Sequence, residues 1–175
     1  RAARRGCTTV SDSGVVVAVS GVKNSGKTAL IVAMLPHLTA AGLRAAVIKH
    51  AGHRFLPEPP DTDTGRFLAA GAWGTAIFDG EKYKVVRREV VDEAALIAQF
   101  PEADLILLEG FKYSAWPKLE VVRGENSEAP VANPTTLLAL VTDLALPGVP
   151  TLPLGDGAGA AALLIRYVKE GKARD

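Results

Sequence analysis

The sequence predicts an α/β fold built on a largely parallel sheet. Fully apolar runs rich in β-branched residues, such as residues 15–20, are typical of strands that are buried on both faces. Segments with apolar residues at helical spacing alternate with these runs, and this alternation indicates parallel strands joined by helices. A motif of the phosphate-loop type lies between the first strand and the first helix, which is its usual place in such a fold. The 175-residue length fits one domain.

The first part of the chain is expected to form a strand, a long helix and a second strand. Residues 28–41 have a helical pattern made by Leu30, Ile31, Met34, Leu35 and Leu38. Pro36 lies inside this pattern, so we expect one kinked helix rather than two, and Gly42 marks its end. Residues 45–48 form the next strand. The proline-rich segment 54–63 is a loop, because proline has no N–H to donate within a central strand.

The remaining elements follow in a regular order. Residues 64–70 and 92–99 are short helices, and between them residues 75–78 and 83–87 form a hairpin around Asp79-Gly80. Residues 105–108 form another fully apolar strand, followed by strands at 119–122, 137–142 and 151–154. An Ala- and Leu-rich helix over residues 159–170 completes the pattern.

Composition excludes several classes of protein. The net charge of +1 does not suit a strongly basic nucleic-acid binder, and a single cysteine rules out a disulfide framework and a four-cysteine zinc site. No apolar run approaches the roughly 20 residues that span a bilayer. We therefore expect a cytoplasmic protein with no membrane or nucleic-acid partner. Residues 1–13 are expected to be a flexible basic leader, and residues 14–175 a single nucleotide-binding domain.

The motif from Gly21 to Thr28 reads G-x-x-x-x-G-K-T and predicts a phosphate-binding loop. Gly21 and Gly26 allow successive backbone N–H groups to converge on phosphate oxygens, next to the positive end of the following helix. Lys27 would reach the β- and γ-phosphates, and Thr28 would be a ligand of Mg²⁺. The positions between the glycines that face the ligand or solvent are Lys23, Asn24 and Ser25. The pattern predicts a P-loop NTPase-like three-layer αβα sandwich with an added hairpin.

A phosphate loop needs an acidic partner for its metal, and Glu109 is the candidate. Glu109 ends the apolar strand at 105–108, at the strand end where α/β sheets bind ligands. We expect it to hold Mg²⁺ directly or through water, with Lys27 and Glu109 as the catalytic pair. The alternative is a carboxylate that merely pairs with a lysine. Asp104, at the other end of the strand, is expected to have a structural role.

Further candidates follow the second strand. Lys49, His50 and His53 are expected to line the nucleotide site. Asp63 and Arg66 lie in or beside the proline-rich loop and could follow the metal and the γ-phosphate as a switch segment. The pair His50 and His53 together with an aspartate could alternatively bind zinc.

Asp143 is the candidate for reading the base. No N-K-x-D sequence, the usual guanine reader of small GTPases, occurs in the chain. Asp143 follows the strand at 137–142, where its carboxylate could accept hydrogen bonds from N1 and N2 of guanine. The alternative is a helix cap or turn residue.

Together the motifs resemble the MobB family of molybdopterin-guanine dinucleotide biosynthesis adapter proteins. The segments concerned are residues 21–28, 47–55, 63–72, 105–112 and 117–121. The resemblance covers about residues 14–155 and implies a dimeric P-loop protein that binds GTP with Mg²⁺ and hydrolyses it weakly. It also implies a partnership with the molybdenum cofactor guanylyltransferase, which joins GMP to molybdopterin, and possible contact with the molybdopterin cofactor itself. Thr62 and the glycine-rich residues 155–159 depart from the family pattern.

Two other functions fit a phosphate loop, namely a small-molecule kinase and a module that stores nucleotide. A kinase needs an acceptor pocket and a lid with arginines, for which Arg87 and Arg88 are candidates. No arginine is evidently in place beside the phosphates, so we expect slow hydrolysis. A dimer could shield the strands at 75–78 or 119–122 if either lies at a sheet edge.

Overall fold

The protein is described by a computed structural model that covers residues 14–52, 55–56 and 58–172. Its contacts divide the chain into two compact units. The first contains the residues up to 50 and those from 94 onward, and the second contains residues 51–93. The predicted leader over residues 1–13 lies outside the described residues, and the single domain over residues 14–175 stays a prediction.

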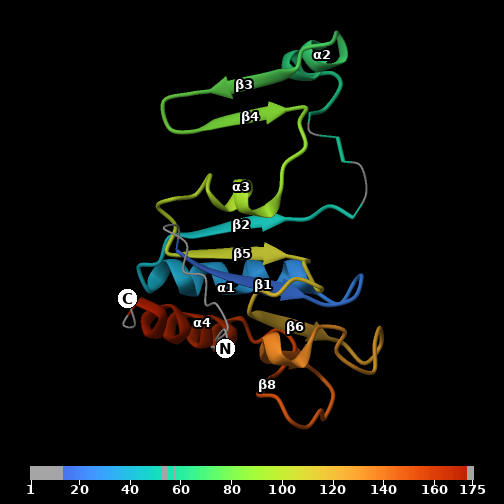
Figure 1. The fold of residues 1–175 in the computed structure, drawn as a ribbon, viewed down its shortest axis with the longest axis vertical. Coiled ribbons are helices and arrows are strands. Elements are labelled where there is room, and N and C mark those ends of the chain that lie inside the picture. The colour runs from blue at the N-terminus through green and yellow to red at the C-terminus, as the bar shows by residue number, and fades with distance from the viewer. Residues whose placement is uncertain (1–13, 53–54, 57, 173–175) are drawn as a thin grey trace, which may run out of the picture. The chain divides into compact units, whose positions relative to one another are not determined.

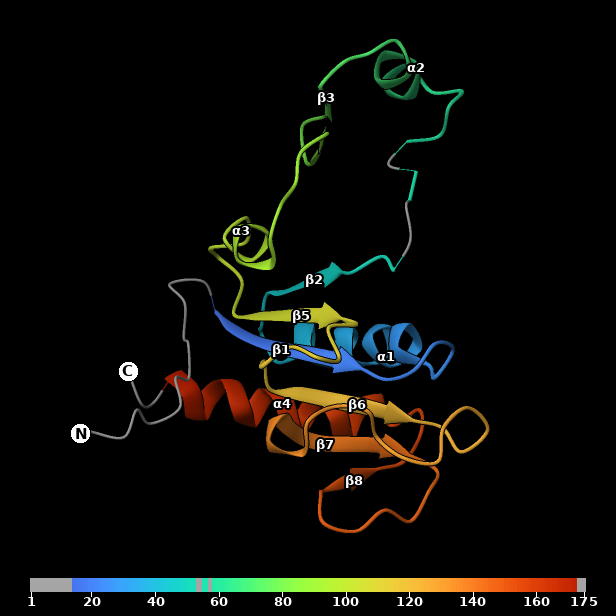
Figure 2. The same ribbon diagram turned by 45° about the vertical axis from the view of Figure 1, so that its right-hand side comes forward.

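A six-stranded sheet forms the centre of the first unit, and every strand pair in it is parallel. Its order is β2-β5-β1-β6-β7-β8, so the strand that precedes the phosphate loop lies in the interior of the sheet (Figure 2). The strands are β1 (Val15–Ser20), β2 (Ala45–Lys49), β5 (Leu105–Glu109), β6 (Lys118–Val122), β7 (Leu137–Thr142) and β8 (Thr151–Leu152). All six were predicted as strands, two of them with the observed boundaries and the others within two residues.

Helices cover both faces of this sheet. Helices α1 (Lys27–Ala40) and α4 (Gly157–Lys172) pack on one face, where Met34 and Leu164 meet Val17 of β1 in the larger core (Figure 1). The short helix α3 (Glu93–Ile97) packs Ile97 against Ala18 and other residues of the opposite face. These layers confirm the predicted αβα sandwich. Helix α1 is continuous and includes Pro36.

The position of β6 corrects one expectation. It lies between β1 and β7, and all five of its residues are buried. Two of them are charged. Lys118 donates to the Ser114 carbonyl at 2.7 Å, and Glu120 accepts from the N–H groups of Val131 and Ala132. Because both edges of β6 are already paired, this strand cannot pair with a second copy of the chain.

The second unit consists of helix α2 (Asp63–Ala69) and an antiparallel hairpin of β3 (Gly74–Phe78) and β4 (Tyr83–Arg87). The Asp79 carboxylate holds the turn by accepting from the N–H groups of Glu81 and Lys82, as expected for an Asp-Gly turn with two further residues. Helix α2 begins after Thr62, whose hydroxyl accepts from Gly65 N–H. The hairpin is confirmed, and it is a separate sheet.

Candidate phosphate-binding site

The candidate site lies at the carboxyl ends of β1, β2 and β5. The parallel register places Lys49 of β2 beside Glu109 of β5, and Glu109 beside Val19 of β1. Partners in register project to the same side of a sheet, so the Lys49 and Glu109 side chains come together at the level of Val19, two residues before the phosphate loop begins at Gly21. The order of the strands along the chain does not predict which of them pair or in what register.

Two glycines fix the shape of the phosphate loop. Gly21 and Gly26 have φ angles of +138° and +104°, a region that residues with a side chain avoid. A Cβ on Gly21 would lie 2.4 Å from the carbonyl oxygen of Val121, so a larger residue cannot fit there. Gly26 is the residue before α1, whose first turn contains no acidic residue and no side-chain cap. The positive end of this 14-residue helix therefore faces the loop with no acidic residue of the helix's own beside it.

The loop also contains a buried hydroxyl that fits a phosphate oxygen. Ser25 is fully buried, and its Oγ has no hydrogen-bond partner among the described residues. Such groups are rare because burial without a partner costs free energy. A phosphate held by the loop would supply the missing acceptor, so this observation supports an anion site at this place. Lys23 and Asn24 are exposed at the loop tip, and Asn24 has a φ of +62°.

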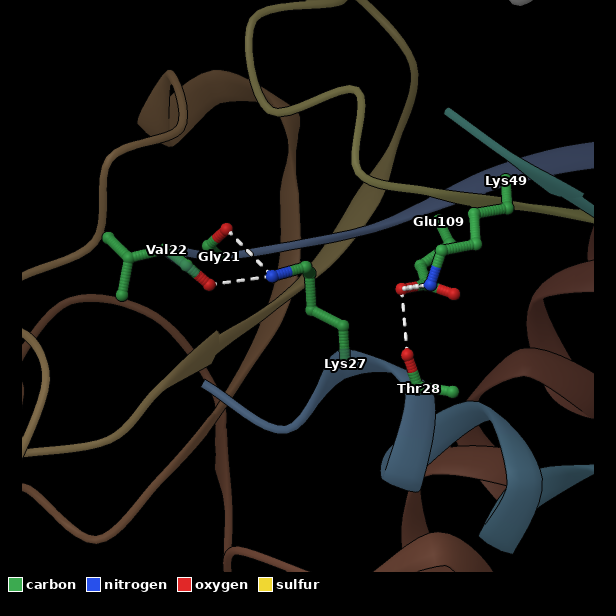
Figure 3. A network of polar contacts seen from close by, with 6 residues as sticks. All are labelled: Gly21, Val22, Lys27, Thr28, Lys49 and Glu109. Atoms are coloured by element: carbon green, nitrogen blue, oxygen red, sulfur yellow. Dashed lines mark hydrogen bonds and ion pairs between the residues drawn. The ribbon is translucent and has the colours of Figure 1, made fainter. Parts of the chain in front are cut away.

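Lys27 folds back over the loop (Figure 3). Its Nζ donates to the carbonyl oxygens of Gly21 at 3.2 Å and Val22 at 2.6 Å. The pKa of Lys27 lies below its ordinary value, mainly because the side chain is partly buried. The negative charge of Glu109 raises this pKa, and the positive charges of Lys49 and Lys112 lower it further. Positive charge therefore gathers around the loop, as binding of a polyphosphate requires.

Glu109 joins Thr28 and Lys49 (Figure 3). Its Oε1 accepts from Thr28 Oγ1 at 2.8 Å and from Lys49 Nζ at 2.9 Å. Burial raises the pKa of Glu109, but hydrogen bonds from Lys49 and Thr28 and the positive charges of Lys49 and Lys27 lower it, and the result is below the ordinary value. The lysine pairing considered as an alternative is present. The two residues predicted to hold Mg²⁺ are also in direct contact, and their hydroxyl and carboxylate oxygens are ligands that suit this ion.

Two cationic residues near the loop were not among the predicted site residues. Lys112 acts on the pKa of Lys27 and stacks its Nζ 4.8 Å from the Tyr113 ring centre. Arg123 follows β6, and its Nη2 would lie 3.6 Å from a Cβ on Gly26. An arginine therefore lies beside Gly26, while the expectation of slow hydrolysis stays a prediction. Neither position could be found from the sequence, because both depend on how loops from β5 and β6 fold back over the sheet edge.

Four of the predicted site residues lie between β2 and β3 in the chain, namely His50, His53, Asp63 and Arg66. His50 follows β2, and its ring meets Phe111 edge-on with centroids 5.6 Å apart. His53 lies outside the described residues. Asp63 and Arg66 belong to the second unit, where Arg66 Nη1 lies 4.0 Å from Asp63 Oδ1. No group of three or more His, Cys, Asp or Glu suited to a metal occurs within residues 14–52, 55–56 and 58–172. Because the zinc alternative includes His53, it stays a prediction.

Asp143 follows β7, as predicted, and takes part in a turn contact. Its Oδ1 accepts from Gly124 N–H at 2.8 Å, which ties the end of β7 to the loop after β6. The carboxylate is exposed. This contact is the turn role considered above, and reading of a base by Asp143 stays a prediction.

Comparison with known proteins identifies the family. Residues 16–143 match the family described as MobB, molybdopterin guanine dinucleotide synthesis protein B. The chain belongs to the MobB family. The resemblance predicted from the motifs is thereby confirmed. Within the described residues, no helix has the length and apolar character needed to cross a membrane.

Relatives and solved structures of the MobB family agree with this assignment. A relative from Bacillus subtilis (strain 168), named "Probable molybdopterin-guanine dinucleotide biosynthesis adapter protein", is 34% identical over 130 residues, which is 72% of this chain and 75% of the relative. The molybdopterin-guanine dinucleotide biosynthesis adapter protein of Escherichia coli (strain K12) is 28% identical over 166 residues, covering 89% and 94% of the two chains. The crystal structure of Bacillus subtilis MobB superimposes with a TM-score of 0.71 at 31% identity, covering 87% of this chain and 96% of that one.

Proposed function

We propose that this chain is a GTP-binding adapter protein in molybdopterin guanine dinucleotide biosynthesis and that it assists the guanylyltransferase of that pathway. The observation that supports nucleotide binding best is the contact of Thr28 Oγ1 with Glu109 Oε1 at 2.8 Å, directly after a complete phosphate loop. The loop supplies backbone donors for phosphates, and the contact joins a hydroxyl to a carboxylate for Mg²⁺. The names of the relatives support the pathway and the adapter role.

The residues of the site have distinct tasks in this proposal. The loop N–H groups and the Lys27 ammonium bind the phosphate oxygens, while Thr28 and Glu109 hold Mg²⁺ directly or through water. When bound, Mg²⁺ neutralises charge on the phosphates and orients them. Lys49 then exchanges its carboxylate partner for phosphate oxygens. Slow hydrolysis fits a role in which the nucleotide biases the chain between two conformations rather than being consumed rapidly.

A homodimer fits the composition of the second unit. A two-stranded hairpin with one helix of 7 residues offers little interior, and isolated hairpins are marginally stable. Its large apolar side chains are widely exposed, among them Trp73, Phe78 and Tyr83. Burial of these side chains against a second copy of the chain would remove them from water. The outer edges of β3 and β4 could pair with the same strands of that copy.

The direct test is nucleotide binding by the full chain. We expect Mg²⁺-dependent binding of GTP in preference to ATP, measured by calorimetry with GTP, GDP and ATP. Labelled nucleotide distinguishes the rival kinase function, because a kinase transfers phosphate to an acceptor whereas a weak GTPase releases it as free phosphate. If the folded protein binds no nucleotide with Mg²⁺, the proposal fails.

The adapter role needs reconstitution. Guanylyltransferase, molybdopterin cofactor and GTP are combined with wild type or with Lys27→Ala, and guanine dinucleotide formation is measured. We expect wild type to increase the yield and to bind the transferase, and the variant to lose the increase. Equal yields with and without wild type, together with no binding to the transferase, would refute the adapter role but not nucleotide binding.

A further inference from the structure

The loop that follows β6 lies against the phosphate loop. Asn126 donates from Nδ2 to the Asn24 carbonyl at 2.8 Å, which attaches residues 123–127 to the tip of the phosphate loop. The N–H groups of Asn126 and Ser127 both donate to the Arg123 carbonyl, so the segment makes a tight turn directly after Arg123. Asp143 holds the next residue, Gly124, through its N–H. The backbone around Arg123 is therefore fixed from three sides.

The Arg123 side chain points toward the second glycine of the phosphate loop. Its Nη2 would lie 3.6 Å from a Cβ on Gly26, the residue at the N-terminus of α1. None of the ion pairs formed among the described residues includes Arg123. A guanidinium beside the positive end of a helix is electrostatically unfavourable unless an anion lies between them. Its five N–H donors match phosphate oxygens, whereas no carboxylate is paired with them here.

We infer that Arg123 is a phosphate-binding residue of the nucleotide site, and that it contacts the polyphosphate from the β6 side while Lys27 contacts it from the loop. The inference rests on the proposed binding of nucleotide at this site. It adds a second side to that site, built by a loop that contains no phosphate-binding motif. The phosphate loop also contains the buried Ser25 hydroxyl, one residue before Gly26, and its lack of a partner among the described residues independently indicates an anion at this place.

Pyrophosphate and GTP are the probes, because pyrophosphate reports the phosphate contacts without the base. Affinities are measured by competition with a fluorescent guanine nucleotide for wild type, Arg123→Ala and Arg123→Lys. Arg166→Ala is the matched control, since Arg166 is an exposed arginine on α4 that pairs with Glu170. Arg123→Ala should lose about tenfold to hundredfold affinity for both probes, the range expected for a charge-assisted contact. The affinity of Arg123→Lys for both probes should lie between those of Arg123→Ala and wild type. All variants should have the melting temperature of wild type.

A further variant separates direct contact from loop structure. Asn126→Ala removes the attachment to Asn24 but keeps the guanidinium, so its loss should be smaller than that of Arg123→Ala. If Arg123→Ala binds pyrophosphate as well as Arg166→Ala does, or if Asn126→Ala reproduces the full loss, the inference is wrong while nucleotide binding stands. If wild type binds neither probe, the inference and the proposed nucleotide site fail together.

Discussion

Replacing Glu109 by glutamine tests whether this carboxylate serves the metal or the fold. Glu109 is only 8% exposed, and its Oε1 meets both Thr28 and Lys49. Glutamine keeps the size of the side chain and an oxygen that can accept from either donor, but it removes the negative charge. A structural role and a metal role therefore predict different losses.

The structure sets the size of each loss. The ion pair with Lys49 is 2.9 Å long, but the lysine side chain is 60% exposed, and pairs with such exposure contribute about 0.2–1 kcal/mol to stability. We therefore expect Glu109→Gln to lower the free energy of unfolding by no more than about 1 kcal/mol. A hydrogen bond to a charged group is worth about 1.5–3 kcal/mol, so the affinity for GTP with Mg²⁺ should fall about tenfold to hundredfold.

The assay is a GTP titration with Mg²⁺ and with EDTA, alongside urea unfolding of the same samples. The ratio of the two affinities should be large for wild type and close to one for Glu109→Gln. Glu102→Gln is the control, because Glu102 pairs with Arg44 at 3.2 Å and both side chains are mostly exposed. If Glu109→Gln keeps the wild-type Mg²⁺ effect and loses several kcal/mol of stability, Glu109 has a structural role only.

Three further predictions concern the same site. Lys27→Ala should weaken GTP binding by about tenfold to hundredfold or more in a protein with a wild-type circular dichroism spectrum, and unchanged affinity would remove the phosphate-loop assignment. Asp143→Asn keeps an oxygen for Gly124 N–H but offers guanine an NH₂ donor, so affinity should shift from GTP toward xanthosine triphosphate; a constant ratio in competition binding means that the base is read elsewhere. Since Glu109 has a folded pKa below its unfolded value of 4.5, its carboxylate stabilises the fold fully above that pH, and this contribution is lost as the pH falls through the folded pKa. Urea unfolding across this range should show a shallower acid loss for Glu109→Gln than for wild type, and equal slopes would contradict the assigned pKa shift.

The parts of the fold that follow local rules were predictable. The sequence pattern predicted all six strands of the main sheet, and the motif from Gly21 to Thr28 lies between β1 and α1 as expected. The parts that depend on contacts distant in the chain were not. The sequence does not show that β6 is an interior strand, because Lys118 and Glu120 are charged and their burial depends on hydrogen bonds to backbone groups of the loops on either side of the strand. Arg123 was missed for the same reason, since its position depends on Asn126 reaching Asn24 across 102 residues of chain.

The sharing of one carboxylate oxygen by Lys49 and Thr28 has a consequence for how nucleotide could act on the rest of the chain. A metal ion bound to Glu109 Oε1 would compete with the Lys49 ammonium, which lies 2.9 Å from that oxygen. Thr28 lies in the first turn of α1, a 14-residue helix that packs Leu30, Ile31 and Met34 into the core, whereas Lys49 is the last residue of an edge strand and its side chain is 60% exposed. Lys49 is therefore the group that would move. The chain continues from it through His50 directly into residues 51–93, the second compact unit. Metal and nucleotide would thus act two residues before the second unit begins, and the proposed adapter role needs a coupling of this kind.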